Sequence, residues 1–214
     1  MSLMFFLRPL VPLILLFSLI LGPTGALAQQ GEGEEDPRLI LQGIIDEISA
    51  VWVPLNLDPN APYDSRRAWA EDLVNWRFDF PHMSRNSLGP NWRQLNEAQQ
   101  EQYRVLFRQI LVETVIDWLD DYDSEVIEIL RVRPAGRNVE ITTRIVYPDG
   151  SRIGATWVVR ETEGMFLFRD VRVAGISLVA DFRGKYVRFM NRDGIEGLFD
   201  RLERDIRRLQ RRHS

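Results

Sequence analysis

Few side chains in this chain could carry acid–base or metal chemistry. The sequence has two histidines, His82 and His213, and no cysteine. Thiolate zinc and iron–sulfur sites are therefore excluded, and imidazole catalysis would depend on His82, since His213 is next to the C-terminus. Asp79 lies three residues before His82, but no third residue follows at ligand spacing, so the pair is better explained as the start of a helix. We expect no catalytic residue, no metal site and no cofactor.

A second group of charges lies in the stretch "DVRVAGISLVADFR", residues 170–183. Asp170 and Arg172 alternate with Val171 and Val173, which would place the two charges on one face of a strand and the valines on the other. A salt bridge explains such a pair as well as an active site does. Asp170 and His82 are the candidate acid or base of an alternative interpretation, in which the protein is a small-molecule enzyme.

The first 28 residues have the pattern of a secretory signal peptide. Arg8 is followed by the apolar run "LVPLILLFSLIL" and by Ala26-Leu27-Ala28, a small-x-small cleavage site. The run is shorter than the ~20 residues that a membrane-spanning helix needs. We therefore expect cleavage near Ala28 and a periplasmic location.

The mature chain is long enough for one domain with a full hydrophobic core. Without Arg8, 26 basic residues face 31 acidic ones, so the net charge changes from −4 to −5 and nucleic acid is disfavoured as a partner. We expect a disordered acidic lead-in over 29–36, a single domain over 37–206 and a basic tail over 207–214. The tail could touch anionic lipid or complement a helix dipole.

Helical signals flank a run of strands. Asp36-Pro37 predicts the start of a helix. Residues 53–64 predict a loop, and residues 65–76 predict a short helix. Asn96 and Gln99 form a capping box before a long helix whose apolar stripe is wide enough for contacts on two sides. From 125 to 173 the period changes to two, which predicts four antiparallel strands in a meander. Two further helices follow Ser177, divided at Gly194.

This order predicts an α+β domain with helices packed on the apolar face of the sheet. The apolar residues exceed what four short strands could cover alone. They can be explained as core or as the wall of a ligand cavity.

Two segments, 78–115 and 166–202, carry a family resemblance. The features are Phe78-Asp79-Phe80, Met83-Ser84-Arg85, Leu88-Gly89 and Trp92-Arg93, then Asp170-Val171, the run from Gly175 to Val179, and Phe182-Arg183. Together they resemble the MlaC family, also called toluene-tolerance or ABC-transporter auxiliary proteins, periplasmic phospholipid carriers of Gram-negative bacteria.

The resemblance implies a nuclear-transport-factor-2-like fold, a twisted four-stranded sheet wrapped by helices around an apolar cavity. It implies a monomeric, non-catalytic carrier with bound phospholipid as cargo, which helps to maintain outer-membrane lipid asymmetry. The implied partners are an inner-membrane ABC transporter with an MCE-domain ring and an outer-membrane lipoprotein–porin complex. The alternatives are the enzyme above and a non-catalytic envelope assembly factor with a filled core.

If the protein is a phospholipid carrier, the acyl chains are expected to lie between the sheet and the helices. The residues assigned to the walls are Ile141, Thr143, Ile145, Ile153, Ala155 and Trp157 from the strands, and Leu111, Val115, Leu178, Phe182 and Tyr186 from the helices. Arg85 and Arg93 are assigned to a lipid headgroup or to a partner surface, with solvated arginines as the alternative.

Overall fold

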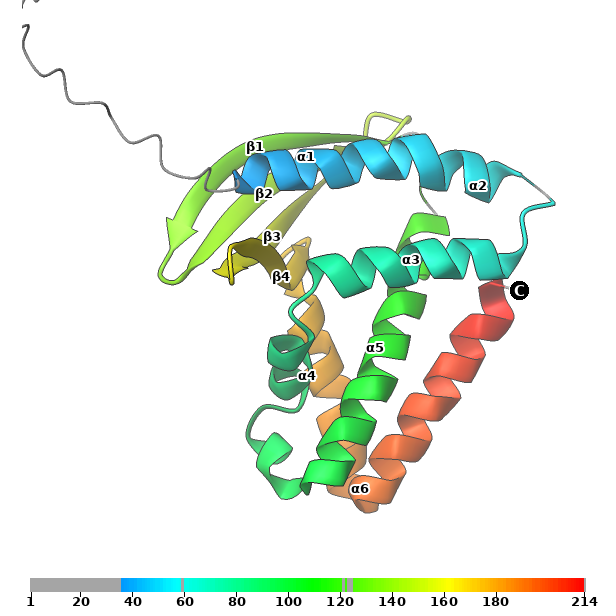
Figure 1. The fold of residues 1–214 in the computed structure, drawn as a ribbon, viewed down its shortest axis with the longest axis vertical. Helices are drawn as coiled ribbons and strands as arrows, with labels where there is room; N and C mark the ends of the chain where they lie inside the picture. Colours follow the sequence, from blue (N-terminus) through cyan, green and yellow to red (C-terminus); the bar gives the residue numbers. More distant parts are fainter. Residues whose placement is uncertain (1–35, 59, 121, 123–124, 214) are drawn as a thin grey trace, which may run out of the picture. The chain divides into compact units, whose positions relative to one another are not determined.

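The structure, a computed structural model, describes residues 36–58, 60–120, 122 and 125–213. The predicted signal peptide and nearly all of the acidic lead-in lie outside the described residues. A sheet of five strands is covered on one face by helices that both precede and follow it in the chain (Figure 1).

The first helical segment begins where the sequence predicts. Helix α1 (Pro37–Glu47) is capped by Asp36, whose side chain accepts a hydrogen bond from the Arg38 backbone N–H at 2.9 Å. It continues as a π-helix, η1 (Ile48–Trp52), and as α2 (Val53–Leu57). The prediction of a loop from residue 53 is therefore wrong. The wider π-helical turn just before Pro54 lets the chain stay helical despite the missing proline N–H.

By length and composition alone, Pro37–Leu57 could cross a membrane. In this domain one side of the segment belongs to the core. Leu41, Ile44 and Trp52 are buried, and the Trp52 indole N–H donates to the Leu119 carbonyl oxygen at 2.9 Å. The segment is therefore placed as a core helix that lies along β1 and β2 (Figure 1).

The sheet is the predicted antiparallel meander with one strand more than expected. Its order follows the chain: β1 (Val126–Ala135), β2 (Asn138–Val146), β3 (Arg152–Thr162), β4 (Met165–Val173) and β5 (Ile176–Ser177). The two-residue β5 pairs with the end of β4 through a tight turn at Ala174 and Gly175, both with positive φ. A strand this short leaves no alternation to detect, so the sequence pattern does not predict it.

The register confirms the predicted face of the sheet. Aligned rows across β2, β3 and β4 consist of Ile141, Trp157 and Val171, and of Thr143, Ala155 and Val173. On the opposite face Arg172 lies against Glu140 at 3.0 Å and against Asp170 at 3.6 Å. This ion-pair network is the salt-bridge explanation of the charges at 170–172.

Three helical segments and one 3-10 helix lead to the sheet: α3 (Tyr63–Arg77), α4 (Phe80–Leu88), η2 (Gly89–Gln94) and α5 (Glu97–Asp120). The predicted capping box is present, because the Gln99 N–H donates to Asn96 Oδ1 at 2.9 Å and the Asn96 N–H donates to Gln99 Oε1 at 3.0 Å. Helix α5 packs against α3, α4 and α6, so the prediction of contacts on more than one side is confirmed.

Helix α6 (Leu178–His213) is broken at Gly194, whose φ of 74° and ψ of −169° are not helical. The predicted division into two helices is confirmed at that residue. Helix α6 continues to His213, so the residues assigned to a basic tail extend the second half of the helix. Its two halves pack beside α5 (Figure 1).

A buried carboxylate joins three of these helices. Glu113 of α5 has no exposed surface and accepts hydrogen bonds from the Tyr63 hydroxyl at 2.7 and 2.8 Å and from the Arg67 Nε at 3.4 Å. Gln210, in the last turns of α6, donates to the same carboxylate at 3.2 Å. Glu113 therefore fastens α3 and the C-terminal end of α6 to α5.

Candidate functional site

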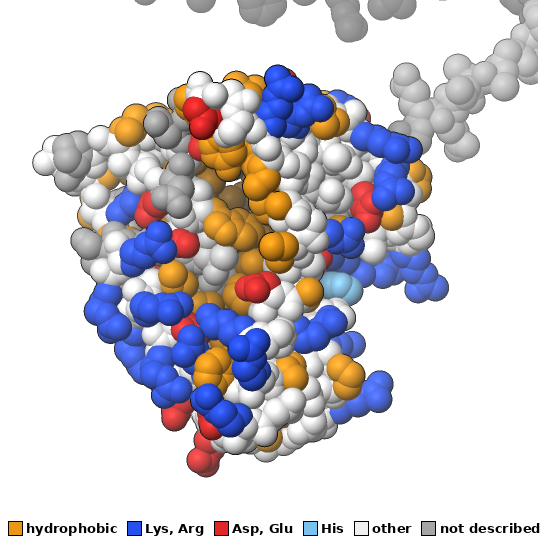
Figure 2. Space-filling view, turned by 180° about the vertical axis from the view of Figure 1, so that it is seen from behind, with side chains coloured by type: hydrophobic (Ala, Val, Ile, Leu, Met, Phe, Trp, Pro, Cys, Tyr) orange, Lys and Arg blue, Asp and Glu red, His pale blue; other side chains and the backbone are white. Residues whose placement is uncertain are grey.

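An apolar pocket opens where the end of β4 meets α5 and the start of α6. It measures about 330 Å³ and is lined by Trp118, Val171, Val173, Ala174, Ile176, Leu178 and Asp181. Ile176 and Trp118 are exposed at 68% and 41%. On the rear face of the domain, Figure 2 shows a hollow with hydrophobic side chains gathered around it. An opening with mainly apolar walls is suited to an apolar ligand.

The inner face of the sheet continues this apolar wall. Ile145, Ile153 and Trp157 are partly exposed on it. The Trp157 indole N–H donates to Thr143 Oγ1 at 3.0 Å, and its ring lies 5.5 Å from that of Phe168. The polar atoms of this wall are thus bonded to one another, so the wall presents an apolar surface.

The residues assigned to the cavity walls differ in exposure. Leu178 lines the pocket directly and Ala155 is aligned with Val173, another lining residue. Val115 and Phe182 are almost fully buried. Four others have no exposed surface: Leu111, Ile141, Thr143 and Tyr186. A ligand would reach these four only if the helices moved away from the sheet.

Tyr186 of α6 has an unusual polar atom for a wall of this kind. Its hydroxyl is buried and has no hydrogen-bond partner among the described residues. Burial is the main cause that raises the pKa of Tyr186 above its ordinary value. Its ring stacks on Phe182 at 5.9 Å, and the Lys185 ammonium lies 5.3 Å from the same ring.

Sequence reasoning missed most of the residues that line the pocket. Val171 and Val173 carried a usable signal, because they alternate with Asp170 and Arg172 and so share the apolar face of β4. Ile176 lies in the short β5 and Trp118 near the end of α5. Nothing in the local sequence indicates that these two segments meet.

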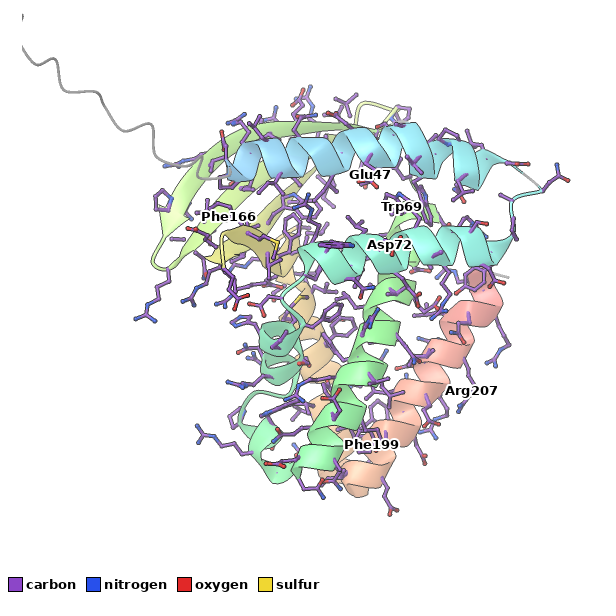
Figure 3. The ribbon with its side chains drawn as sticks, in the orientation of Figure 1. Glu47, Trp69, Asp72, Phe166, Phe199 and Arg207 are labelled. Atoms are coloured by element: carbon purple, nitrogen blue, oxygen red, sulfur yellow. The ribbon has the colours of Figure 1, made fainter. Side chains whose placement is uncertain are left out.

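A contact on the front of the domain joins α1 to α3. Figure 3 shows Trp69 of α3 and Glu47 of α1 between the two helices, and the Trp69 indole N–H donates to Glu47 Oε1 at 3.1 Å. The Trp69 ring also lies 5.4 Å from the buried Trp52 ring. This contact joins the helix that covers β1 and β2 to the helix next to α5.

Arg85 and Arg93 lie away from the apolar pocket. Together with Arg183 they line a different hollow of about 410 Å³, between α4, η2 and α6. On α6, Leu178 and Asp181 face the apolar pocket, whereas Arg183 points to another side of the helix. The two arginines are therefore not placed at the rim of the apolar pocket.

The two candidates for acid–base chemistry share a polar pocket of about 260 Å³. Each takes part in a hydrogen bond that caps the start of a helix. Asp170 Oδ1 accepts the Val179 N–H at 3.1 Å at the start of α6. Asp79 caps α4 by accepting the His82 backbone N–H at 3.0 Å, as the helix-start explanation requires. Burial, followed by the nearby Arg169 guanidinium, lowers the pKa of the His82 imidazole.

The start of α6 is capped twice. Besides the bond to Asp170, the Ala180 N–H donates to Ser177 Oγ at 3.0 Å, so the residue that the predicted helix follows also caps it. Within the described part of the chain, no group of three or more His, Cys, Asp or Glu residues could hold a metal ion. Asp170 and Ser177 thus stabilise the start of α6, which forms one wall of the apolar pocket.

Comparisons with known proteins agree with this arrangement. A solved structure of a phospholipid-binding protein from Ralstonia solanacearum, in complex with a phospholipid, superposes with a TM-score of 0.67. The two proteins are 19% identical over 82% of this chain and 99% of the other. No curated protein matches the sequence. The family model described as MlaC protein matches residues 55–204, which include the strands and most of the helices around the pocket. The chain belongs to the MlaC family.

Proposed function

We propose that this protein is a phospholipid carrier that shields acyl chains between its sheet and its helices. The observation that carries the proposal is the pocket at the end of β4, whose lining is apolar except for Asp181 and which adjoins the apolar sheet face. Family membership supports it, as does the likeness in fold to a protein solved with a phospholipid.

A carrier is needed because a phospholipid cannot cross water at a useful rate. A diacyl lipid exposes about 30 methylenes, and at about 0.8 kcal/mol each their transfer to water costs on the order of 25 kcal/mol. The headgroup must stay wet, since burial of a charged phosphate without partners would cost several kcal/mol more. A pocket with apolar walls and an open rim satisfies both conditions.

The burial of the assigned wall residues indicates that loading requires expansion. Leu111, Ile141, Thr143 and Tyr186 have no exposed surface, so acyl chains do not reach them in this arrangement. We infer that room for the chains is created when α5 and α6 separate from the sheet. This movement would bring Leu111, Ile141, Thr143 and Tyr186 into contact with the acyl chains.

Membership of the family supports a proposal for the wider role. We propose that the chain adopts the family's nuclear-transport-factor-2-like fold and acts as a monomer in the periplasm after cleavage near Ala28. There it would pass lipid between an inner-membrane ABC transporter with an MCE-domain ring and an outer-membrane lipoprotein–porin complex, which helps to maintain outer-membrane asymmetry. A non-catalytic role fits the capping bond made by Asp170. It also fits the position of His82 in a pocket other than the apolar one.

Lipid analysis of the purified protein tests the proposal. Phospholipid should be extracted from the native protein with organic solvent and identified by mass spectrometry. Val173→Asp places a carboxylate on the pocket lining, where it opposes the acyl chains, and should leave the folded protein without lipid. Its control is Val126→Asp, a strand valine that is 59% exposed and does not line the pocket. Native protein without lipid, or equal lipid in both variants, would contradict the proposal.

A further inference from the structure

Arginines without carboxylate partners gather on one surface formed by α4, η2 and the first half of α6. Arg85, Arg93 and Arg183 line one hollow, and Arg183 and Arg188 line an adjoining one of about 560 Å³. No Asp or Glu is among the lining residues of either hollow. Among the described residues, none of these four arginines forms an ion pair. We call these two hollows the arginine groove.

Elsewhere on the domain some arginines, such as Arg137 and Arg152, are exposed and form no ion pair among the described residues, whereas others are paired with carboxylates. Arg169 lies 2.9 Å from Asp79, Arg66 lies 2.9 Å from Asp120, and Arg212 lies 2.8 Å from Asp117. The whole chain carries a net negative charge, so carboxylates are not scarce. A surface that keeps four cations without an anion in such a chain is complementary to an anionic partner.

The floor of the groove is made of small and apolar residues. Ala180, Gly184 and Val187 follow one face of α6 and meet Leu88 and Pro90 from the other side. A Cβ added to Gly184 would meet no atom within 4 Å, so the groove is open above this residue. The stretch from Ala180 to Asn191 spans roughly 16 Å of helix, about three turns.

One arginine is fixed in the groove by the chain itself. The Arg183 Nε donates to the Asn86 carbonyl oxygen at 2.7 Å. The Arg183 side chain packs over Gly89, where an added Cβ would lie 3.4 Å from that nitrogen. Gly89 has a φ of 57°, which glycine adopts without strain. The terminal nitrogens of Arg183 stay available to an incoming carboxylate.

We propose that the arginine groove is the docking site for a carboxylate-rich segment of a partner protein. The concave shape favours a segment over a flat bilayer, because a flat surface would touch the flanking arginines but leave the floor of small residues empty. One part of this inference rests on the proposed carrier role: the partner is taken to be a protein that delivers or receives the lipid.

The position of the groove suits such a partner. Leu178 and Asp181 of α6 face the apolar pocket, whereas Ala180, Gly184 and Val187 face the groove from another side of the helix. A segment bound in the groove would therefore leave the mouth of the apolar pocket uncovered. Lipid could enter or leave while the carrier is held.

The test uses a labelled helical peptide of about 12 residues with glutamates on one face, a length matched to the groove. Binding to the purified protein is measured by fluorescence anisotropy at low salt. Arg85→Glu/Arg93→Glu should weaken binding about tenfold, because two attractive contacts become repulsive. The matched control is Arg137→Glu/Arg152→Glu, which changes charge equally at two exposed arginines outside the groove and should have no more than about a twofold effect.

A second variant tests the groove itself. Gly184→Leu keeps every charge, favours the helix and fills the floor of the groove, so it should also weaken peptide binding about tenfold. Peptide affinity that stays within about twofold of the wild-type value in either Gly184→Leu or the groove double variant overturns the proposal. Binding to vesicles of equal phosphatidylglycerol and phosphatidylcholine is measured as well. If the protein binds these vesicles through Arg85 and Arg93 but does not bind the peptide, the docking proposal is overturned in favour of a membrane surface.

Copurified lipid is measured on the same preparations. Groove variants that keep their lipid but lose the peptide support a docking site separate from the cargo site. If the wild-type protein holds no lipid, the carrier proposal fails, and the peptide measurements still decide whether the groove binds an acidic segment.

Discussion

Replacement of Tyr186 by phenylalanine should make the protein more stable. The Tyr186 hydroxyl is buried without a partner among the described residues, and such a group costs about 1–3 kcal/mol of stability. Phenylalanine removes this oxygen and keeps the ring, which stacks on Phe182 at 5.9 Å and lies near Lys185. We expect the free energy of unfolding of lipid-free protein to rise by about 1 kcal/mol.

Tyr103→Phe is the matched control, with the opposite sign. Tyr103 is equally buried, but its hydroxyl is 2.7 Å from the Ser87 Oγ, so the two share a hydrogen bond. Loss of that bond should cost about 0.5–1.5 kcal/mol. The two substitutions remove the same atom from the same kind of side chain, so their difference isolates the effect of the missing partner.

Urea denaturation of lipid-free protein measures both effects, and a thermal scan provides a second readout. For a chain of this length, 1 kcal/mol corresponds to about 2–4 °C in Tm. A Tyr186→Phe variant less stable than the wild type by 1 kcal/mol or more would refute the reasoning, since the hydroxyl would then make a favourable bond. Repeating the comparison on lipid-loaded protein shows whether the hydroxyl gains a partner from the cargo.

Three further predictions concern charge. Glu113→Gln should lower the free energy of unfolding by about 1–3 kcal/mol, because it weakens the hydrogen bonds that join three helices. The control Glu101→Gln removes one partner of an exposed ion pair and should change the free energy of unfolding by less than about 0.5 kcal/mol; urea titrations measure both variants. The pKa of His82 is lowered in the folded protein, so the unfolded chain binds more protons below about pH 6.5 and stability should fall as the pH drops through this range. Denaturation at pH 7.5 and 5.5 measures the fall, which should be smaller in His82→Gln. Ala155→Asp, at 2% exposure, should cost several kcal/mol and lower Tm sharply, and an unchanged Tm would show that the site is wetter than the packing indicates.

Local signals in the sequence predicted most of the fold. The capping box of Asn96 and Gln99 depends on two residues three apart, and the four longer strands depend on alternation over nine or more residues. The helix beyond Val53 and the strand at Ile176 were missed for the same reason. A π-helical turn and a two-residue strand are fixed by distant packing, and neither has a periodic pattern.

The candidate site was predictable only in part. Alternation indicates which face of a strand is apolar, and it therefore placed Ile141 and Ile145 on the same wall. It does not show that Ile141 is fully covered while Ile145 stays partly open. That difference depends on how closely the helices approach each strand, which is a property of the assembled domain.

The first turns of α6 form one wall of the apolar pocket and, on another side, one wall of the arginine groove. A movement of these turns that enlarges the pocket also changes the width of the groove. A loaded carrier and an empty one would then offer different surfaces to an acidic segment. A partner that contacts only the outside of the protein could distinguish the two forms without reaching the cargo.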